Sequence, residues 1–149
     1  MAEIRPVSAR PRSNISRSQA GEDLYGTIGI PREDKPARLR QLAKNGELFG
    51  APIGIFFCLD RKLGPPQWAD VGMYMQNVML LAAERGLDTC PQEYWSRYPQ
   101  TLARVLDLPG ELMVFAGMAL GFRDADHPIN GLRTPRDPFE AWGELRGFD

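Results

Sequence analysis

Two short segments of the sequence carry residue types that suit ligand binding. The first, Thr89–Glu93, follows a long apolar stretch, and the second, Asn130–Arg136, lies near the C-terminus. The second segment holds Arg133 and Arg136 with Gly131 close by, a combination suited to a phosphate, because each guanidinium binds phosphate bidentately. The alternative is that both arginines are solvated surface residues, and spacing alone favours that alternative.

The remaining residues form no constellation of catalytic or metal-binding side chains. His127 is the single histidine, and Cys58 and Cys90 each lack a neighbouring cysteine. This pattern excludes a histidine-based triad, a multi-histidine metal site and a zinc site of paired cysteines. The glycine-rich dinucleotide and nucleotide motifs are also absent, which disfavours those folds. We therefore expect no metal and no catalytic side chain, in a protein of a reducing compartment such as the cytoplasm.

Composition indicates one soluble domain. The chain has 149 residues, of which 43% are hydrophobic and 25% are charged, and its formal net charge is -1. That balance leaves no basic excess to hold a nucleic-acid backbone. The longest stretch with few charges, Val71–Ala83, is too short to cross a bilayer. Neither a nucleic acid nor a membrane is an expected partner.

The first residues differ in composition from the rest. Four arginines, four serines and two prolines fall within the first twenty residues. Pro6 and Pro11 break the amphipathic helix that a transit peptide would need, and no apolar signal-peptide run follows. We expect residues 1–23 to form a flexible Arg/Ser-rich arm and residues 24–149 to form the domain.

Alternating helix and strand signals in the domain indicate an α/β or α+β layering. A strand is predicted over Pro52–Leu59, apolar on both faces and therefore placed at the centre of a sheet. The other predicted elements are a helix starting at Asp34 and ending at Gly50, a helix over Gln67–Arg85, an extended piece at Leu87–Pro91, a helix over about Tyr98–Leu106, a strand over Glu111–Leu120 and a short helix at Phe139–Leu145.

The helix predicted over Gln67–Arg85 is apolar nearly all round. Trp68, Met75 and Met79 belong to one stripe, whereas Met73 and Leu80 lie on other faces. Such a helix must be covered on several sides, and a chain this small has few elements to cover it. We expect a subunit interface to supply the cover, with a purely internal core as the alternative.

Many segments of the chain, taken in order, resemble the FMN-dependent nitroreductase family, particularly nitrobenzoate-reductase-like members. The resemblance runs from about Leu24 to the C-terminus. Its segments are Leu24-Tyr25, Gly29–Lys35, Phe49–Gly54, Gln67–Met73, Gln76–Leu87, Thr89–Glu93, Gly117–Gly121 and Pro128–Asn130.

The resemblance implies an α+β fold with a mixed sheet flanked by helices. It also implies an intertwined homodimer with the long helix at its centre, and FMN bound at the dimer interface. The expected cofactor-binding residues are the segment beside the flavin ring and the arginines at the ribityl phosphate, namely Pro91, Gln92, Glu93, Tyr94, Arg133 and Arg136.

The chemistry implied by the resemblance belongs to the flavin. NAD(P)H, the co-substrate, reduces FMN, and a nitroaromatic or quinone acceptor then takes the electrons. No side chain is required as acid or base, in agreement with the missing catalytic constellation. Trp95, Tyr94 and Phe122 are candidate walls of the site for the small aromatic acceptor, with core packing as the alternative.

The resemblance departs from the family at the N-terminus. Members carry an Arg-x-Ser-x-Arg type segment that binds the FMN phosphate, and Arg10–Asn14 is similar to it only superficially because it lies just before Leu24. We therefore expect the family domain to be incomplete at its N-terminus. The alternatives to an enzyme are a non-catalytic truncated dimerisation scaffold or inactive subunit of the same fold, and an unrelated soluble α/β binding domain.

Overall fold

The computed structural model describes residues 17–145 and residue 147. The chain divides into two compact units, one formed by residues 35–124 and the other by residues 1–34 together with 125–149. Each unit is described by itself below. The expected arm lies largely outside the described residues, and its last part, from Arg17, belongs to a helix.

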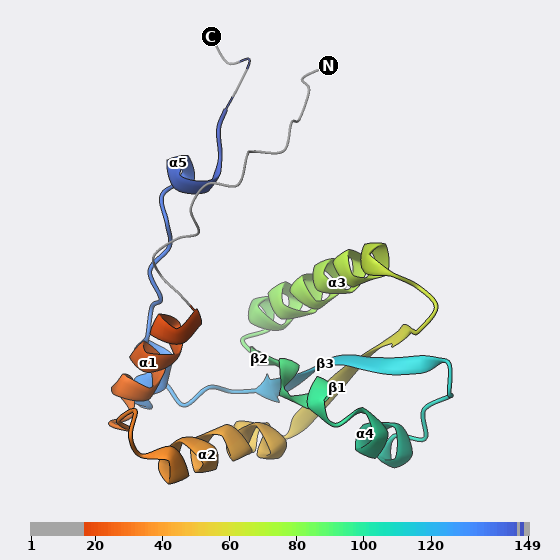
Figure 1. Ribbon diagram of the computed structural model, residues 1–149, viewed down its shortest axis with the longest axis horizontal. Helices are drawn as coiled ribbons and strands as arrows, with labels where there is room; N and C mark the ends of the chain where they lie inside the picture. Colours follow the sequence, from red (N-terminus) through yellow and green to blue (C-terminus); the bar gives the residue numbers. More distant parts are fainter. Residues whose placement is uncertain (1–16, 146, 148–149) are drawn as a thin grey trace. The chain divides into compact units, whose positions relative to one another are not determined.

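A three-stranded sheet organises the larger unit (Figure 1). Its strands are β1 (Ile53–Asp60), β2 (Asp88–Gln92) and β3 (Leu112–Gly121), in the order β1-β3-β2. Both pairings with β3 are antiparallel, so these described strands do not show the mixed pairing that the resemblance implied. The α+β class itself is confirmed.

The position of β1 differs from the prediction. β1 is an edge strand of this sheet, and β3 lies at the centre. The apolar run predicted burial on both faces, but only Phe57 and Leu59 in β1 are buried, whereas β3 buries most of its length. An apolar run indicates that a strand packs against other parts of the chain. It does not indicate how many strands pair with that strand.

The core of this unit lies against β3. Met118 is fully buried in the strand, and helix α4 (Pro99–Val105), which packs against β3, contributes the buried Leu102. β2 continues directly into a 3-10 helix, η2 (Glu93–Arg97), so that the end of the strand is joined to a tight turn. Strand β3 therefore provides the buried platform on which the β2–η2 corner rests.

The helix predicted from Asp34 to Gly50 is two elements. An α-helix, α2 (Lys35–Ala43), is followed by a 3-10 segment, η1 (Lys44–Gly50). Leu48, Phe49 and Gly50 all have positive φ, at 53°, 54° and 82°. Such a conformation costs about 1–3 kcal/mol at a non-glycine residue, so the surrounding structure must hold this turn in place.

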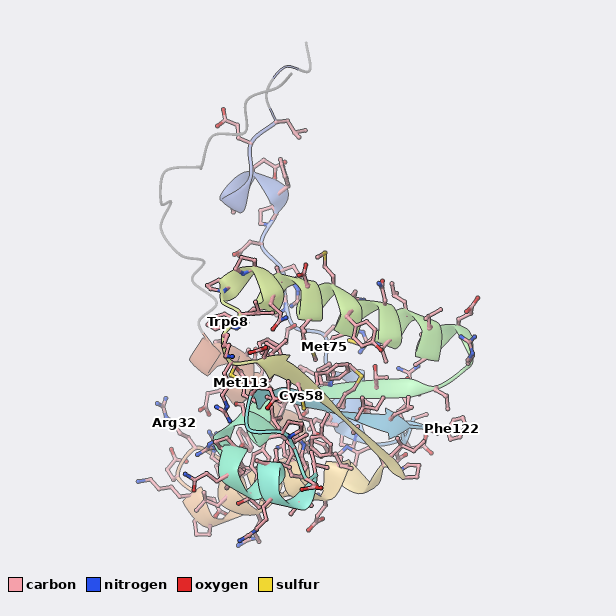
Figure 2. The ribbon with its side chains drawn as sticks, turned by 90° about the vertical axis from the view of Figure 1, so that its right-hand side faces the viewer. Arg32, Cys58, Trp68, Met75, Met113 and Phe122 are labelled. Atoms are coloured by element: carbon pink, nitrogen blue, oxygen red, sulfur yellow. The ribbon has the colours of Figure 1, made fainter. Side chains whose placement is uncertain are left out.

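The long helix α3 (Pro65–Glu84) forms as predicted. Gly64-Pro65 starts it, and Gly86 follows its end at φ 71°, the left-handed conformation that terminates many helices. Figures 1 and 2 show α3 beside the sheet, and the ring of Tyr74 contacts that of Phe57 in β1.

Most of the apolar surface of α3 is not covered by the described chain. Ala82 is its one buried residue, while Leu80 is 60% exposed and Met73 is 61% exposed. Trp68 and Leu81 are also exposed. The own-chain core that was weighed as an alternative therefore does not cover these side chains within the described part of the chain.

The smaller unit contains α1 (Arg17–Thr27), η3 (Pro128–Gly131) and α5 (Phe139–Trp142). The sequence did not predict α1, which has almost no amphipathic pattern. The predicted tail helix is present but shorter, since the extended backbone at Gly143 ends it. Among the described residues, no helix combines the length and hydrophobicity needed to span a membrane.

Candidate functional site at the corner of β2 and η2

The first segment singled out in the sequence lies where β2 turns into η2. Pro91 is exposed near the end of the strand, opposite Met118 of β3. Glu93 is exposed at the start of η2, and Tyr94 is half-buried. The extended piece predicted at Leu87–Pro91 is confirmed as β2.

Gln92 differs from its neighbours because its side chain is buried. Only 3% of this residue is exposed. Its amide nitrogen donates to the backbone oxygen of Asn45 at 3.0 Å and to Asn45 Oδ1 at 3.1 Å. Its amide oxygen accepts from Trp95 Nε1 at 3.3 Å. A buried amide normally needs such partners, since an unpaired one costs about 1–3 kcal/mol.

Trp95 packs its ring against other aromatic side chains of the larger unit. Its ring meets Phe56 and Tyr94 edge to face, with centroids 5.2 Å and 5.6 Å apart. It also lies against Gly117, where a Cβ atom would come within 2.9 Å of Trp95 Nε1. Trp95 therefore has the core role that was weighed for it, whereas Phe122 is 80% exposed just beyond β3 (Figure 2).

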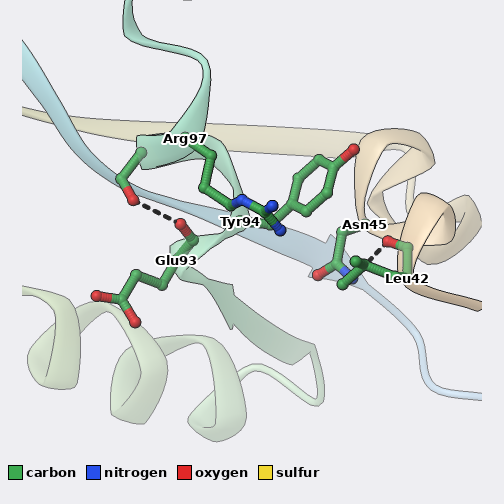
Figure 3. A pocket seen from close by; sticks show the side chains of 6 residues that line it. Leu42, Asn45, Glu93, Tyr94 and Arg97 are labelled. Carbon is green, nitrogen blue, oxygen red and sulfur yellow. Dashed lines mark hydrogen bonds between the residues drawn. The ribbon is translucent and has the colours of Figure 1, made fainter. Parts of the chain in front are cut away.

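A pocket of about 440 Å³ opens between η1 and η2 (Figure 3). One wall comes from the α2–η1 segment and the other from η2; its lining residues are Leu42, Asn45, Glu93, Tyr94, Ser96 and Arg97. Figure 3 shows Arg97 beside Tyr94, and the carboxylate of Glu93 turned away from Asn45. The pocket thus has an aromatic ring, an amide and a guanidinium within one concave surface.

Hydrogen bonds orient several of these lining groups. Asn45 Nδ2 donates to the backbone oxygen of Leu42 at 2.9 Å, and Ser96 Oγ donates to the backbone oxygen of Glu93 at 2.7 Å. A hydrogen bond with Tyr98 raises the pKa of the Tyr94 hydroxyl. Tyr94 therefore stays protonated at neutral pH and presents an uncharged ring to the pocket.

Asn45 and Leu42 were not predicted as site residues from the sequence. A signal was available for Asn45, because Asn-Gly within a helical pattern marks a helix end. Asn45-Gly46 does lie in the 3-10 segment after α2. Asn45 accepts a hydrogen bond from Gln92, which lies 47 positions away, and no local sequence pattern predicts such a contact.

Arg133 and Arg136 belong to the smaller unit, where both are exposed. Arg133 Nη1 donates to the backbone oxygen of Asn130 at 3.1 Å. Arg136 Nη1 donates to the backbone oxygen of Thr134 at 3.2 Å and also bonds its hydroxyl. In these hydrogen bonds each arginine side chain contacts the backbone of its own loop. That the two arginines bind a phosphate stays a prediction.

The described residues contain no group of three or more His, Cys, Asp or Glu side chains that could hold a metal ion. Partial burial raises the pKa of the Cys90 thiol, which disfavours the reactive thiolate. The groups that line the pocket at this corner include polar and aromatic side chains that can bind a ligand.

Sequence comparison places the chain among known proteins. The pattern of the nitroreductase family matches residues 10–122. The chain belongs to the nitroreductase family. Among curated relatives, this nitroreductase-family chain is 36% identical over 129 residues to a 4-nitrobenzoate reductase of Pseudomonas putida, covering 87% of this chain and 57% of that protein. It is 42% identical over 131 residues to a nitrobenzene nitroreductase of Ectopseudomonas oleovorans, covering 88% and 56%.

Solved structures give the same family fold. An FMN and NADPH-dependent nitroreductase NfnB from sphigopyxis sp. strain HMH superimposes with a TM-score of 0.88 at 39% identity, covering 99% of this chain and 66% of that one. The FMN-dependent nitroreductase NfnB from Mycobacterium smegmatis, in complex with NADPH, has a TM-score of 0.83 at 25% identity and covers 87% and 58%. The family resemblance and the α+β nitroreductase fold are thus confirmed, in a chain that spans little more than half the length of the curated relatives it matches.

Proposed function

We propose that this chain carries part of an FMN-dependent nitroreductase site that passes electrons from NAD(P)H to nitroaromatic or quinone acceptors. The observation that carries the proposal is the pocket at the β2–η2 corner. Glu93 and Tyr94, which the sequence resemblance placed beside a flavin ring, line that pocket. The names of the relatives supply FMN, NADPH and a nitroaromatic acceptor, and the quinone alternative comes from the sequence resemblance alone.

The pocket's size and donor set fit a flat polar ring. Ligand pockets commonly measure about 300–1,000 Å³, and this one measures about 440 Å³. Tyr94 offers an aromatic ring edge, and the Arg97 guanidinium offers N–H donors beside it. The Asn45 amide, fixed by its bonds to Gln92 and Leu42, adds a second oriented polar group.

FMN bound here would supply the electron-transfer chemistry itself, accepting electrons from NAD(P)H and giving them to the acceptor. The chain's residues would bind and orient the reactants. Tyr94 would exclude water from one side of the pocket, and Asn45 and Arg97 would offer polar groups to hold the ring. Pro91 and Gln92 hold the turn that carries Glu93 and Tyr94. Within the smaller unit, Arg133 and Arg136 remain the proposed pair for binding a phosphate group.

We also propose that the chain forms a homodimer through α3. Exposed apolar side chains run along this helix, including Met73, Leu80 and Leu81. A contiguous exposed apolar patch of this kind favours association, because burial removes it from water. The free cysteines Cys58 and Cys90 support a reducing, cytoplasmic location.

A visible absorption spectrum tests the proposed activity. The purified chain, incubated with FMN and freed of excess cofactor, should retain a yellow flavin spectrum. It should also oxidise NADH or NADPH in the presence of a nitrobenzoate. A preparation with neither property would contradict the proposal.

The exposed face of α3 also supports a second candidate, a non-catalytic dimerisation scaffold or inactive subunit. Sedimentation separates the two candidates. A stable dimer that retains no flavin would favour the scaffold, whereas a folded monomer would contradict both.

A further inference from the structure

Gln92 does not line the pocket, yet it bonds to groups on both sides of it. Towards η1 it donates to two oxygens of a single residue, the backbone oxygen and Oδ1 of Asn45. Towards η2 it accepts from the indole nitrogen of Trp95. Three of its hydrogen-bonding positions are therefore engaged between two segments far apart in the chain.

The partners of Gln92 are themselves constrained. Asn45 Nδ2 donates to Leu42, which fixes which end of the Asn45 amide faces Gln92. Trp95 is held between Phe56 and Tyr94 and against Gly117, the residue paired with Gln92 across the sheet. Because both partners are held, Gln92 has one geometry that satisfies all three bonds.

We propose that Gln92 is a positioning residue that fixes the separation between the two walls of the pocket. Its bonds to Asn45 hold η1, which belongs to one wall of the pocket, against β2. Its bond to Trp95 holds η2, which carries Tyr94 in the other wall, against β3. If the proposed function is correct, the spacing that Gln92 sets between the walls determines how tightly a flavin ring binds; in this respect the inference rests on the proposed function. Gln92 thereby acts through Asn45 and Trp95, with its own side chain buried away from the ligand.

The test compares wild-type protein with Gln92→Leu in the full chain, since leucine keeps the volume and removes all three bonds. The first readout needs no cofactor: the indole N–H signal of Trp95 in a proton–nitrogen correlation spectrum, assigned with Trp95→Phe. We expect Gln92→Leu to move this signal upfield and to speed its exchange with water about tenfold, because the bond to Gln92 is lost. The second readout is the dissociation constant for FMN, which should rise about tenfold.

Two further variants separate positioning from general stability. Val114→Ala trims a buried side chain of β3 outside this cluster and should lower the thermal midpoint while leaving the indole signal and FMN affinity unchanged. Gln92→Glu keeps an acceptor for Trp95 but loses the donors to Asn45, so it should preserve the indole signal and still weaken FMN binding. Gln92→Met replaces Gln92→Leu if the leucine variant does not fold.

An unchanged indole signal in Gln92→Leu would overturn the inference, as would an FMN affinity within twofold of wild type. Loss of FMN affinity in Val114→Ala equal to that in Gln92→Leu would overturn it too, by showing a purely structural effect. If wild-type protein binds no FMN, the proposed function fails. The indole signal then still decides whether Gln92 ties the two walls together.

Discussion

Gly117→Ala tests the packing beneath the pocket directly. An alanine Cβ at this position would overlap Cδ1 of Trp95 and would stand 2.9 Å from its Nε1 and 3.0 Å from its Cγ. Ordinary contact begins at 3.4 Å, so the indole must retreat. Phe56 and Tyr94 contact the ring, and retreat also lengthens its 3.3 Å bond to Gln92.

The cost of Gly117→Ala follows from these contacts. Overpacking of a core costs about 1–3 kcal/mol, and loss of the bond to Gln92 adds about 0.5–1.5 kcal/mol. Replacing glycine restricts the unfolded chain, which offsets about 0.4–1 kcal/mol. Overpacking outweighs that gain, so the free energy of unfolding should fall by about 0.5–4 kcal/mol.

Urea unfolding followed by circular dichroism measures this loss. With a slope of about 2 kcal/mol per molar urea, the midpoint should fall by about 0.25–2 M. The matched control is Gly21→Ala inside α1, where a Cβ meets nothing within 4 Å. That change should be neutral or stabilise by up to about 1 kcal/mol. A midpoint for Gly117→Ala equal to wild type would refute the described packing of Trp95.

Two further predictions concern the proposed dimer and the proposed phosphate ligands. Leu80→Glu should raise the dimer dissociation constant at least thirtyfold in sedimentation experiments, because burying the exposed part of a leucine is worth about 1–2 kcal/mol and a twofold interface counts it twice. Val105→Glu, at another exposed aliphatic position, on α4, should leave the dimer intact. Alanine substitution of Arg133 or Arg136 should weaken FMN binding about tenfold to a hundredfold, as loss of a charge-assisted bond costs about 1.5–3 kcal/mol. Arg123→Ala, which removes the ion pair with Asp88, is the control, and equal loss in that variant would count against a specific role.

Local patterns in the sequence predicted the elements that carry the site. The apolar run that starts at Pro52 marked β1, the run that ends before Gly121 marked β3, and Gly86 marked the end of α3. These signals succeed because they depend on neighbours within a few residues. The edge position of β1 was missed, because strand order depends on pairing between distant segments.

The candidate site was predicted only in part, because it too depends on contacts between distant segments of the chain. Glu93 and Tyr94 line the pocket, but no local pattern distinguished them from Gln92, whose side chain is buried. A polar residue at the end of a short strand predicts exposure. Hydrogen bonds to Asn45 and Trp95 compensate the cost of burying the Gln92 amide, and Asn45 lies 47 positions away in the sequence. Buried polar clusters of this kind become visible only once the fold brings their members together.

The exposed helix and the pocket are connected through one short turn. α3 ends at Glu84 and β2 begins at Asp88, and Leu87 N donates to the backbone oxygen of the buried Ala82 at 2.9 Å. A partner molecule on α3 would therefore restrain the strand that ends in Gln92. Dimerisation and ligand binding then depend on one continuous segment, so an enzyme and a scaffold built on this fold would share the α3 interface. They would differ at the β2–η2 corner, and substitutions at Gln92 and Gly117 discriminate between them where substitutions on α3 cannot.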